Sequence, residues 1–274
     1  MDEITAEYAV AELAPAIPLR FRPTFRVAAK TDMGRVRENN EDKFEFYIPE
    51  DERLLAGRGA VFMVCDGMGG HAAGQIASEL AAKTFLDVFY THSADDQGEA
   101  ISAAIRAANR YVLGVGQSVP GRRGMGTTLT ALIVRQDEAW IGHVGDTRVY
   151  RWREASTERL TTDHTFVEES IRMGTLTPEA AAVHPHRHVL MRAIGAEDAL
   201  VPEVLQFDAR VGDRYLLCTD GLNNHVGDEL IGEVLDRLGP SEAAWHLVER
   251  ALQDGGSDNT TVLVVRIEDL VPAS

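Results

Sequence analysis

The amino-acid sequence predicts an α+β fold. Short runs of β-type residues recur along the chain between Gly, Asp and Asn residues, and helical patterns occur in adjacent pairs instead of alternating with the strands. A parallel sheet built from βαβ units needs that alternation, so we expect separate layers of strands and helices. The 274 residues are enough to bury a substantial core.

Eight segments have the composition of β-strands. They are rich in β-branched, aromatic and other apolar residues, and turn-forming residues bound each of them. In chain order the predicted strands are 25–31, 43–48, 60–65, 128–134, 139–144, 148–152, 214–218 and 261–267.

Four segments carry apolar residues at helical spacing. In the first, Ile76, Leu80 and Phe85 lie on one face of the predicted helix. Ser241 is expected to be the N-cap of the last. The predicted helices form two adjacent pairs, 74–90 with 98–116 and 227–238 with 241–253.

The N-terminal region does not have the pattern of a folded element. Residues 1–24 mix Ala and charged residues with prolines at positions 15, 18 and 23, and we expect a partly disordered extension. The first residues are acidic and lack the basic start and apolar core of a signal peptide. No apolar run approaches the roughly 18 residues that span a bilayer, so we expect a soluble, cytoplasmic protein without membrane insertion.

Charge and cysteine content exclude further classes. The 43 acidic and 27 basic residues give a net charge of -16, which repels nucleic acid and anionic membranes at long range, so nucleic acid is not an expected partner. Cys65 and Cys218 lie in apolar strand-like runs and are expected to be reduced core residues. The "NTT" at Asn259 matches a glycosylation acceptor, which has no meaning without secretion.

The run VFMVCDGMGGHAAG, from Val61 to Gly74, ends an apolar strand on Asp66 and then on glycines. A P-loop would need a Gly-Lys pair followed by Ser or Thr, which this run lacks. It also lacks the Gly-x-Gly-x-x-Gly spacing and the βαβ context of a dinucleotide site. We interpret the glycines as bends that bring the backbone close to a group bound by Asp66.

Acidic residues border several other predicted strands. Asp220 follows a predicted strand, and Asp146 lies in a tight turn between two of them. Glu41, Asp42 and Asp258 each precede a predicted strand. Loops at one end of packed sheets lie close together even when they are distant in sequence. We therefore expect several of these carboxylates to meet.

Crowded carboxylates raise one another's pKa and need a cation to neutralise them. No cysteine or convincing histidine set accompanies the acidic residues, so the expected cation is Mg²⁺ or Mn²⁺ before Zn²⁺. Two such ions about 3.5–4 Å apart could share one carboxylate and lower the pKa of a bridging water, which yields a nucleophile suited to a phosphate ester.

The ordered motifs of the chain resemble those of the metal-dependent protein phosphatases of type 2C, specifically the bacterial serine/threonine phosphatases. The resemblance covers roughly residues 25–267. It rests on TDMGRVRENNEDKF, VCDGMGGHAAG, GMGTTLTALIV, IGHVGDTRVYRW, LTTDHT, LMRAIG, LLCTDGL and GGSDNTTVLVV. Their common order and spacing make a chance match improbable.

This resemblance implies a site for two metal ions. Asp66 would bridge the ions, the Gly67 carbonyl and Glu41 would complete one site, and Asp220 and Asp258 would complete the other.

Three further residues receive roles from the same resemblance. Asp42 would hold a metal-bound water, and Asp146 would bind a third, weaker ion. Arg37 would grip the substrate phosphate, because a planar guanidinium can make two charge-assisted hydrogen bonds.

The family fold is a sandwich of two antiparallel sheets flanked on each side by an antiparallel helix pair, which agrees with the predicted element order. The expected phosphatase domain is 25–268, with a variable flap at 165–195 and a C-terminal tail at 269–274. In animal members a histidine after the first Asp-Gly is the general acid. Here Met68 takes that place, which leaves His71 or a metal-bound water as alternative proton donors.

Other motifs have plainer interpretations. His184, His186 and His188 alternate along an extended segment and could face a zinc ion together, but we interpret them as polar flap surface. His164 is expected to organise a loop through hydrogen bonds. The glycines of GMGTT are expected to serve strand entry instead of phosphate binding.

The expected function is that of a monomeric Mn²⁺- or Mg²⁺-dependent phosphatase. It would hydrolyse phosphoserine and phosphothreonine in substrates of a serine/threonine kinase by a metal-activated water, without a phosphoenzyme. One alternative is a catalytically weak regulatory member that binds phosphoproteins, and another is a scaffold with a structural cation. The retained Glu41, Asp66, Asp220 and Asp258 disfavour the first alternative, and Arg37 disfavours the second.

Overall fold

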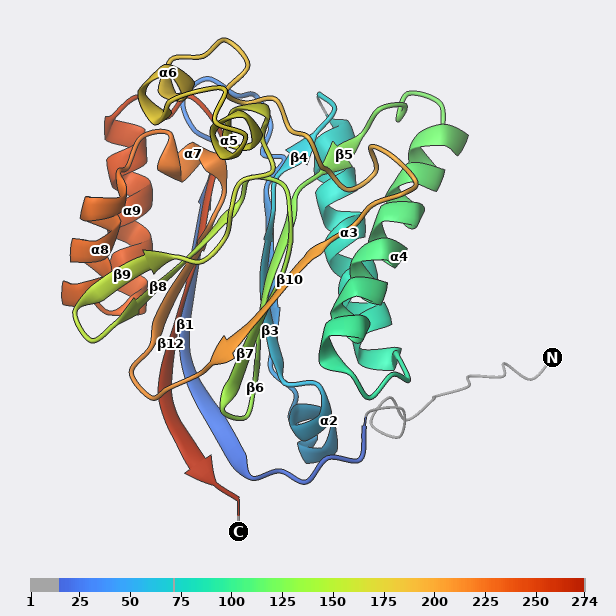
Figure 1. The fold of residues 1–274 in the computed structure, drawn as a ribbon, viewed down its shortest axis with the longest axis vertical. Coiled ribbons are helices and arrows are strands. Elements are labelled where there is room, and N and C mark those ends of the chain that lie inside the picture. The colour runs from blue at the N-terminus through green and yellow to red at the C-terminus, as the bar shows by residue number, and fades with distance from the viewer. Residues whose placement is uncertain (1–14, 71, 274) are drawn as a thin grey trace.

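The computed structural model describes residues 15–70 and 72–273 and confirms the α+β class. Two five-stranded antiparallel sheets pack face to face, and helices cover both outer faces (Figure 1). This is the α-β-β-α sandwich that the resemblance implied.

One sheet contains the first and last strands of the chain. Its strand order is β1 (Phe21–Asp32), β12 (Thr260–Pro272), β11 (Arg214–Cys218), β8 (Arg148–Arg153) and β9 (Ser156–Arg159). The other sheet has the order β10 (Glu203–Asp208), β7 (Glu138–Val144), β6 (Leu129–Arg135), β3 (Ala60–Cys65) and β2 (Lys43–Tyr47). A short ladder of β4 (Gly67–Met68) and β5 (Gly126–Thr127) lies beyond the end of β3.

The predicted helix pairs form the two outer layers. The pair α3 (Ala72–Thr91) and α4 (Gln97–Ser118) packs on the sheet that contains β3, and the pair α8 (Asp228–Arg237) and α9 (Pro240–Gln253) packs on the sheet that contains β11. Asp96 caps α4 by accepting a hydrogen bond from the Glu99 N–H.

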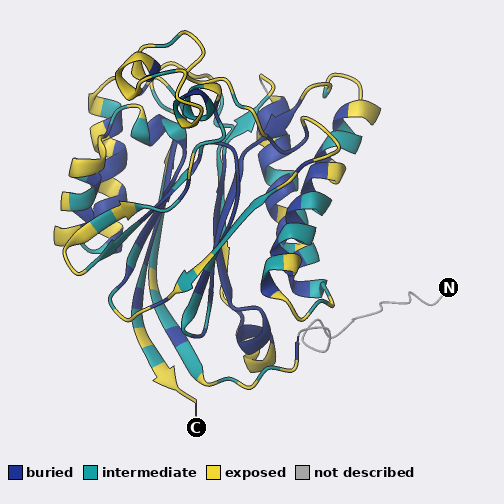
Figure 2. Cartoon of the chain, viewed as in Figure 1, coloured by how far each residue is buried: buried dark blue, intermediate teal, exposed yellow. Residues whose placement is uncertain are grey.

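Strand β3 shows why its sequence is a continuous apolar run. All six of its residues are buried, because one face meets the opposite sheet and the other meets the helices. Phe62 and Val64 lie in the core between the sheets, whereas Met63 and Cys65 pack against α3 and α4. The central strands are accordingly dark blue along their length in Figure 2.

Several elements differ from the sequence prediction. Four strands and four short helices were not predicted from the sequence: β4, β5, β9, β10, α2 (Glu52–Gly57), α5 (Phe166–Arg172), α6 (Pro178–Ala182) and α7 (Asp220–Asn223). Ser241 is not an N-cap, because α9 begins at Pro240 after Gly239 and proline is favoured at the first helical position. The two cysteines are buried free thiols, as predicted.

The ends of the sandwich extend past the predicted domain limits of 25–268. Strand β1 begins at Phe21 and includes Pro23, which an edge strand tolerates, and β12 runs to Pro272. Of the predicted extension at 1–24, residues 1–14 lie outside the described part of the chain. No helix among the described residues is long and apolar enough to cross a membrane.

Candidate metal centre

One cavity at the end of the sandwich brings together the acidic residues singled out in the sequence. It has a volume of about 560 Å³, and Asp66 and Asp220, which follow β3 and β11, are among its lining residues. Figure 1 shows that these strands finish at the end of the sandwich that carries α5 and α6. All six predicted metal-binding residues line it: Glu41, Asp66, Gly67, Asp146, Asp220 and Asp258.

Asp66 is held at the end of β3 by the two threonines of the GMGTT motif. The Asp66 backbone N–H donates to Thr128 Oγ1 at 2.8 Å. Its carbonyl accepts from the Thr127 hydroxyl and from the Thr128 N–H, both at 2.8 Å. Because both threonines are buried, these hydrogen bonds hold the backbone of Asp66 in one position and so restrict where its carboxylate can lie.

Glu41 is positioned by Asn259, a role that was not predicted from the sequence. The Glu41 N–H donates to Asn259 Oδ1 at 2.8 Å, and Asn259 Nδ2 donates to the carbonyls of Met33 and Asn39, both at 2.9 Å. Asn259 is only 6% exposed, so it is a buried connector between loops and not an accessible glycosylation site. Its place directly after Asp258 was the one signal in the sequence.

Two glycines of the DGMGGHAAG run make room for Glu41. A Cβ on Gly74 would lie 1.9 Å from Glu41 Oε2, and a Cβ on Gly67 would lie 2.5 Å from the Glu41 carbonyl oxygen. The Gly67 N–H donates to that same carbonyl at 3.2 Å. The glycines therefore permit a close approach that any side chain would block.

Asp42 lies behind the cavity with one oxygen unused. Thr219 Oγ1 donates to Asp42 Oδ2 at 2.8 Å, whereas Asp42 Oδ1 is buried and has no hydrogen-bond partner among the described residues. Burial raises the pKa of Asp42 to about 7. A buried carboxylate oxygen of this kind suits an additional hydrogen-bond donor, such as a water molecule.

The electrostatics of the cavity favour the binding of a cation. Burial, together with the neighbouring carboxylates, raises the pKa of Asp66 and of Asp220, and raises that of Asp146 to about 8. Oxygen donors that repel one another when ionised are the ligands that Mg²⁺ and Mn²⁺ prefer, so this set fits those ions.

Arg37 lies at the mouth of the cavity with its side chain 55% exposed. Its Nη2 donates to Asp258 Oδ2 at 2.7 Å, and this hydrogen bond raises the pKa of the guanidinium. The structure therefore places the predicted phosphate-binding cation beside a predicted metal ligand.

The three flap histidines do not share one site. The rings of His184 and His186 pack against Phe166, with centroids 5.5 and 5.8 Å from its ring, as suits flap surface. His188 instead lines the acidic cavity, with Nδ1 3.9 Å from Asp220 Oδ2, a position that was not predicted from the sequence. Met68 also lines the cavity and carries no transferable proton, whereas His71 lies outside the described residues.

Comparisons with known proteins agree with this site. Residues 35–254 match the family described as Protein phosphatase 2C. Serine/threonine protein phosphatase PstP of Mycobacterium tuberculosis (strain H37Rv) is 40% identical over 244 residues, which cover 89% of this chain and 45% of the relative. Serine/threonine phosphatase stp of Listeria innocua is 35% identical over 241 residues, which cover 86% of this chain and 93% of the relative.

A solved structure is similar along most of the chain. The catalytic domain of serine threonine protein phosphatase PstP in complex with 2 manganese ions superposes with a TM-score of 0.77 at 37% identity. The match covers 90% of this chain and 100% of that one. This chain thus spans less than half of the full mycobacterial relative and nearly all of the Listeria relative.

Replacing Gly74 by alanine should weaken Mn²⁺ binding by about tenfold or more, because the new Cβ would displace the Glu41 carboxylate. Isothermal titration calorimetry measures the affinity. The matched control is Gly114→Ala in α4, where a Cβ would meet no atom within 4 Å. That control should keep wild-type affinity and stabilise the helix by about 0.5–1 kcal/mol. Equal affinities of the two variants would contradict the role given to Gly74.

The stability of the metal-free protein should fall as pH rises. The folded protein retains protons on Asp42 and Asp146 up to about pH 7 and 8, respectively, which an unfolded chain releases near pH 3.9. The folded state therefore binds more protons, and its stability is lost as pH increases through that window. Melting temperatures measured with chelator and with Mn²⁺ should diverge between about pH 4 and 8. A stabilisation by Mn²⁺ that does not grow with pH would contradict this.

Proposed function

Because this chain belongs to the protein phosphatase 2C family, we propose that it is a Mn²⁺- or Mg²⁺-dependent serine/threonine protein phosphatase. The observation that carries the proposal is one cavity that gathers Glu41, Asp66, Asp220 and Asp258, with Arg37 at its mouth. A structural cation site would need the carboxylates alone. The added arginine suits an anionic ligand such as a phosphoryl group.

In the proposed site the carboxylates hold two ions. As the family resemblance implies, Asp66 would contribute to both sites, with Glu41 and the Gly67 carbonyl completing one and Asp220 and Asp258 completing the other. When bound, the two ions would lower the pKa of a water molecule and polarise the phosphoryl group. The manganese complex of the structural relative supports this choice of metal.

Asp42 and Asp146 have separate proposed roles. The unpartnered Oδ1 of Asp42 would accept a hydrogen bond from a water in the cavity and so orient it. Asp146, in the turn between β7 and β8, would supply a carboxylate for a third, weaker ion.

Hydrolysis would proceed by direct attack of water on phosphorus. The bond from phosphorus to the water oxygen forms and the bond to the serine or threonine oxygen breaks; the attacking water releases one proton, and the departing oxygen takes one up. None of the roles given to these residues requires a covalent phosphoenzyme. Cytoplasmic location and a monomeric state stay predictions from the sequence.

Arg37 would bind the phosphate dianion, which the acidic surface otherwise repels. The chain has a net charge of -16, and Arg37 is the one Arg or Lys among the described residues that line the metal cavity. Its guanidinium would have to turn partly from Asp258 to the phosphate, and that exchange becomes easier when Asp258 binds an ion.

The purified protein should hydrolyse a phosphothreonine peptide with Mn²⁺ and lose turnover when a chelator is added. The variants Asp66→Ala and Asp220→Ala should each reduce turnover at least about 100-fold, because each removes a ligand of the proposed centre. Asp87→Ala, at an exposed position of α3, is the control and should keep full activity. If the wild-type protein is folded and loaded with Mn²⁺ but shows no turnover, the proposal is wrong.

Replacing Arg37 by alanine should raise KM for the phosphopeptide by about tenfold or more, with a smaller change in kcat, because substrate binding loses a charge-assisted contact. Steady-state kinetics separate the two parameters. Arg106→Ala, which breaks an ion pair with Glu99 on α4, removes the same charge far from the cavity and should change neither. Equal KM values for Arg37→Ala and wild type would show that Arg37 does not bind phosphate.

A further inference from the structure

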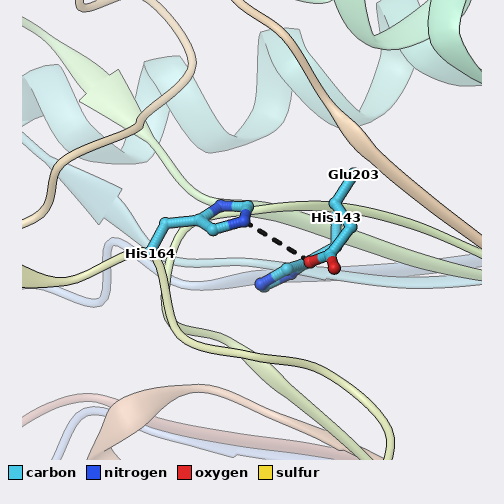
Figure 3. A group of neighbouring side chains, drawn as sticks. All are labelled: His143, His164 and Glu203. Atoms are coloured by element: carbon cyan, nitrogen blue, oxygen red, sulfur yellow. Dashed lines mark ion pairs between the residues drawn. The ribbon is translucent and has the colours of Figure 1, made fainter. Parts of the chain in front are cut away.

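A second polar cluster lies outside the metal cavity. His143 on β7, His164 in the loop before α5, and Glu203 at the start of β10 place one nitrogen or oxygen atom each within 4.8 Å of one another (Figure 3). Such a group could be a metal site or a hydrogen-bonded support. The hydrogen bonds of His143 and His164 distinguish between these two interpretations.

His143 has no lone pair available for a metal ion. Its Nε2 lies 3.0 Å from the Thr162 carbonyl oxygen, which can only accept, so Nε2 must carry the proton. Its Nδ1 is engaged with the Thr130 hydroxyl at 2.7 Å. Burial lowers the pKa of His143 to about 4, so the ring is neutral. The cluster is therefore better explained as a hydrogen-bonded support.

His164 makes two hydrogen bonds with a single residue, Gly145. The Gly145 N–H donates to His164 Nδ1 at 3.1 Å, and the His164 N–H donates to the Gly145 carbonyl at 2.8 Å. Gly145 has φ +114°, and a Cβ there would lie 2.5 Å from the Thr128 side chain. Both polar backbone groups of this constrained residue thus depend on His164, and the next residue is Asp146.

Glu203 favours the His164 tautomer in which Nδ1 can accept the hydrogen bond from the Gly145 N–H. Arg192 Nη1 also lies 3.4 Å from His164 Nε2, and a neutral ring cannot accept from both Arg192 and Gly145. Glu203 Oε2 lies 3.5 Å from Nε2, as the dashed line in Figure 3 shows, and its carboxylate favours a proton on that nitrogen. Nδ1 is then the acceptor that the Gly145 N–H requires.

His164 also contacts the end of the flap. Its carbonyl accepts from the Met191 N–H at 2.8 Å, and Met191 lies within the predicted flap at 165–195. A single residue therefore bonds to the turn that carries Asp146 and to the segment that returns from the flap to the sandwich.

We propose that His164, oriented by Glu203, is a positioning residue that fixes the Gly145–Asp146 turn and joins it to the flap. The hydrogen-bonding part of this inference stands on its own. The consequence for a third metal ion rests on the proposed function, through the role given to Asp146.

The metal-free protein tests the hydrogen bond directly. Asparagine at position 164 can place an oxygen acceptor near the site of Nδ1, whereas glutamine places its polar group near Nε2. Hydrogen exchange of the Gly145 amide, followed by NMR with chelator present, should accelerate about tenfold in His164→Gln and remain near wild type in His164→Asn. Equal exchange rates in the two variants, whether fast or slow, would overturn the assignment. Because they differ by one methylene, a general packing defect would affect both.

Manganese binding tests the consequence. Calorimetric titration should show the two tighter ions unchanged and the weakest ion bound about tenfold more weakly in His164→Gln than in His164→Asn. A third ion bound equally by both variants and wild type would overturn the link from His164 to Asp146. If wild type binds no third ion, the role of Asp146 and the link to it both fail, and Gly145 exchange still decides whether His164 holds the turn.

Discussion

The structure depends on holding several carboxylates together at one end of a β-sandwich. Burial and mutual repulsion raise the pKa of Asp66, Asp146 and Asp220, so the folded chain tolerates this arrangement by retaining protons or by binding cations. The apolar layers on both faces of each sheet supply the rigidity that this requires. The proposed chemistry follows from the same repulsion, because a divalent cation would neutralise the carboxylates and would activate a water molecule.

A layer of uncharged contacts behind the carboxylates fixes their positions. Thr127 and Thr128 bind the backbone of Asp66, and Asn259 binds the backbone of Glu41. Their hydrogen bonds lie in buried surroundings, where an unmade bond is costly. These contacts connect loops that are far apart in sequence, so the geometry of the centre is a property of the whole sandwich.

Local sequence patterns predicted most of the fold because they record burial. The six apolar residues of β3 are buried on both faces, and the helix pairs show the spacing of one buried stripe. Strand β10 was not predicted, because it is an edge strand in which two of the six residues are exposed and none is fully buried, so its apolar pattern is weak. The N-cap prediction at Ser241 failed because Pro240 can occupy the first position of the helix.

The sequence by itself determined which strands end on acidic residues, and its motifs carried the family resemblance, since both features depend only on contiguous residues. Only the tertiary structure decided that Asn259 binds Glu41, that Gly74 makes room for the Glu41 carboxylate, and that His188 faces the cavity. It also decided that His164 holds Gly145. Each of these contacts joins separate segments, and their distances arise when the sheets and loops pack, so no local pattern encodes them.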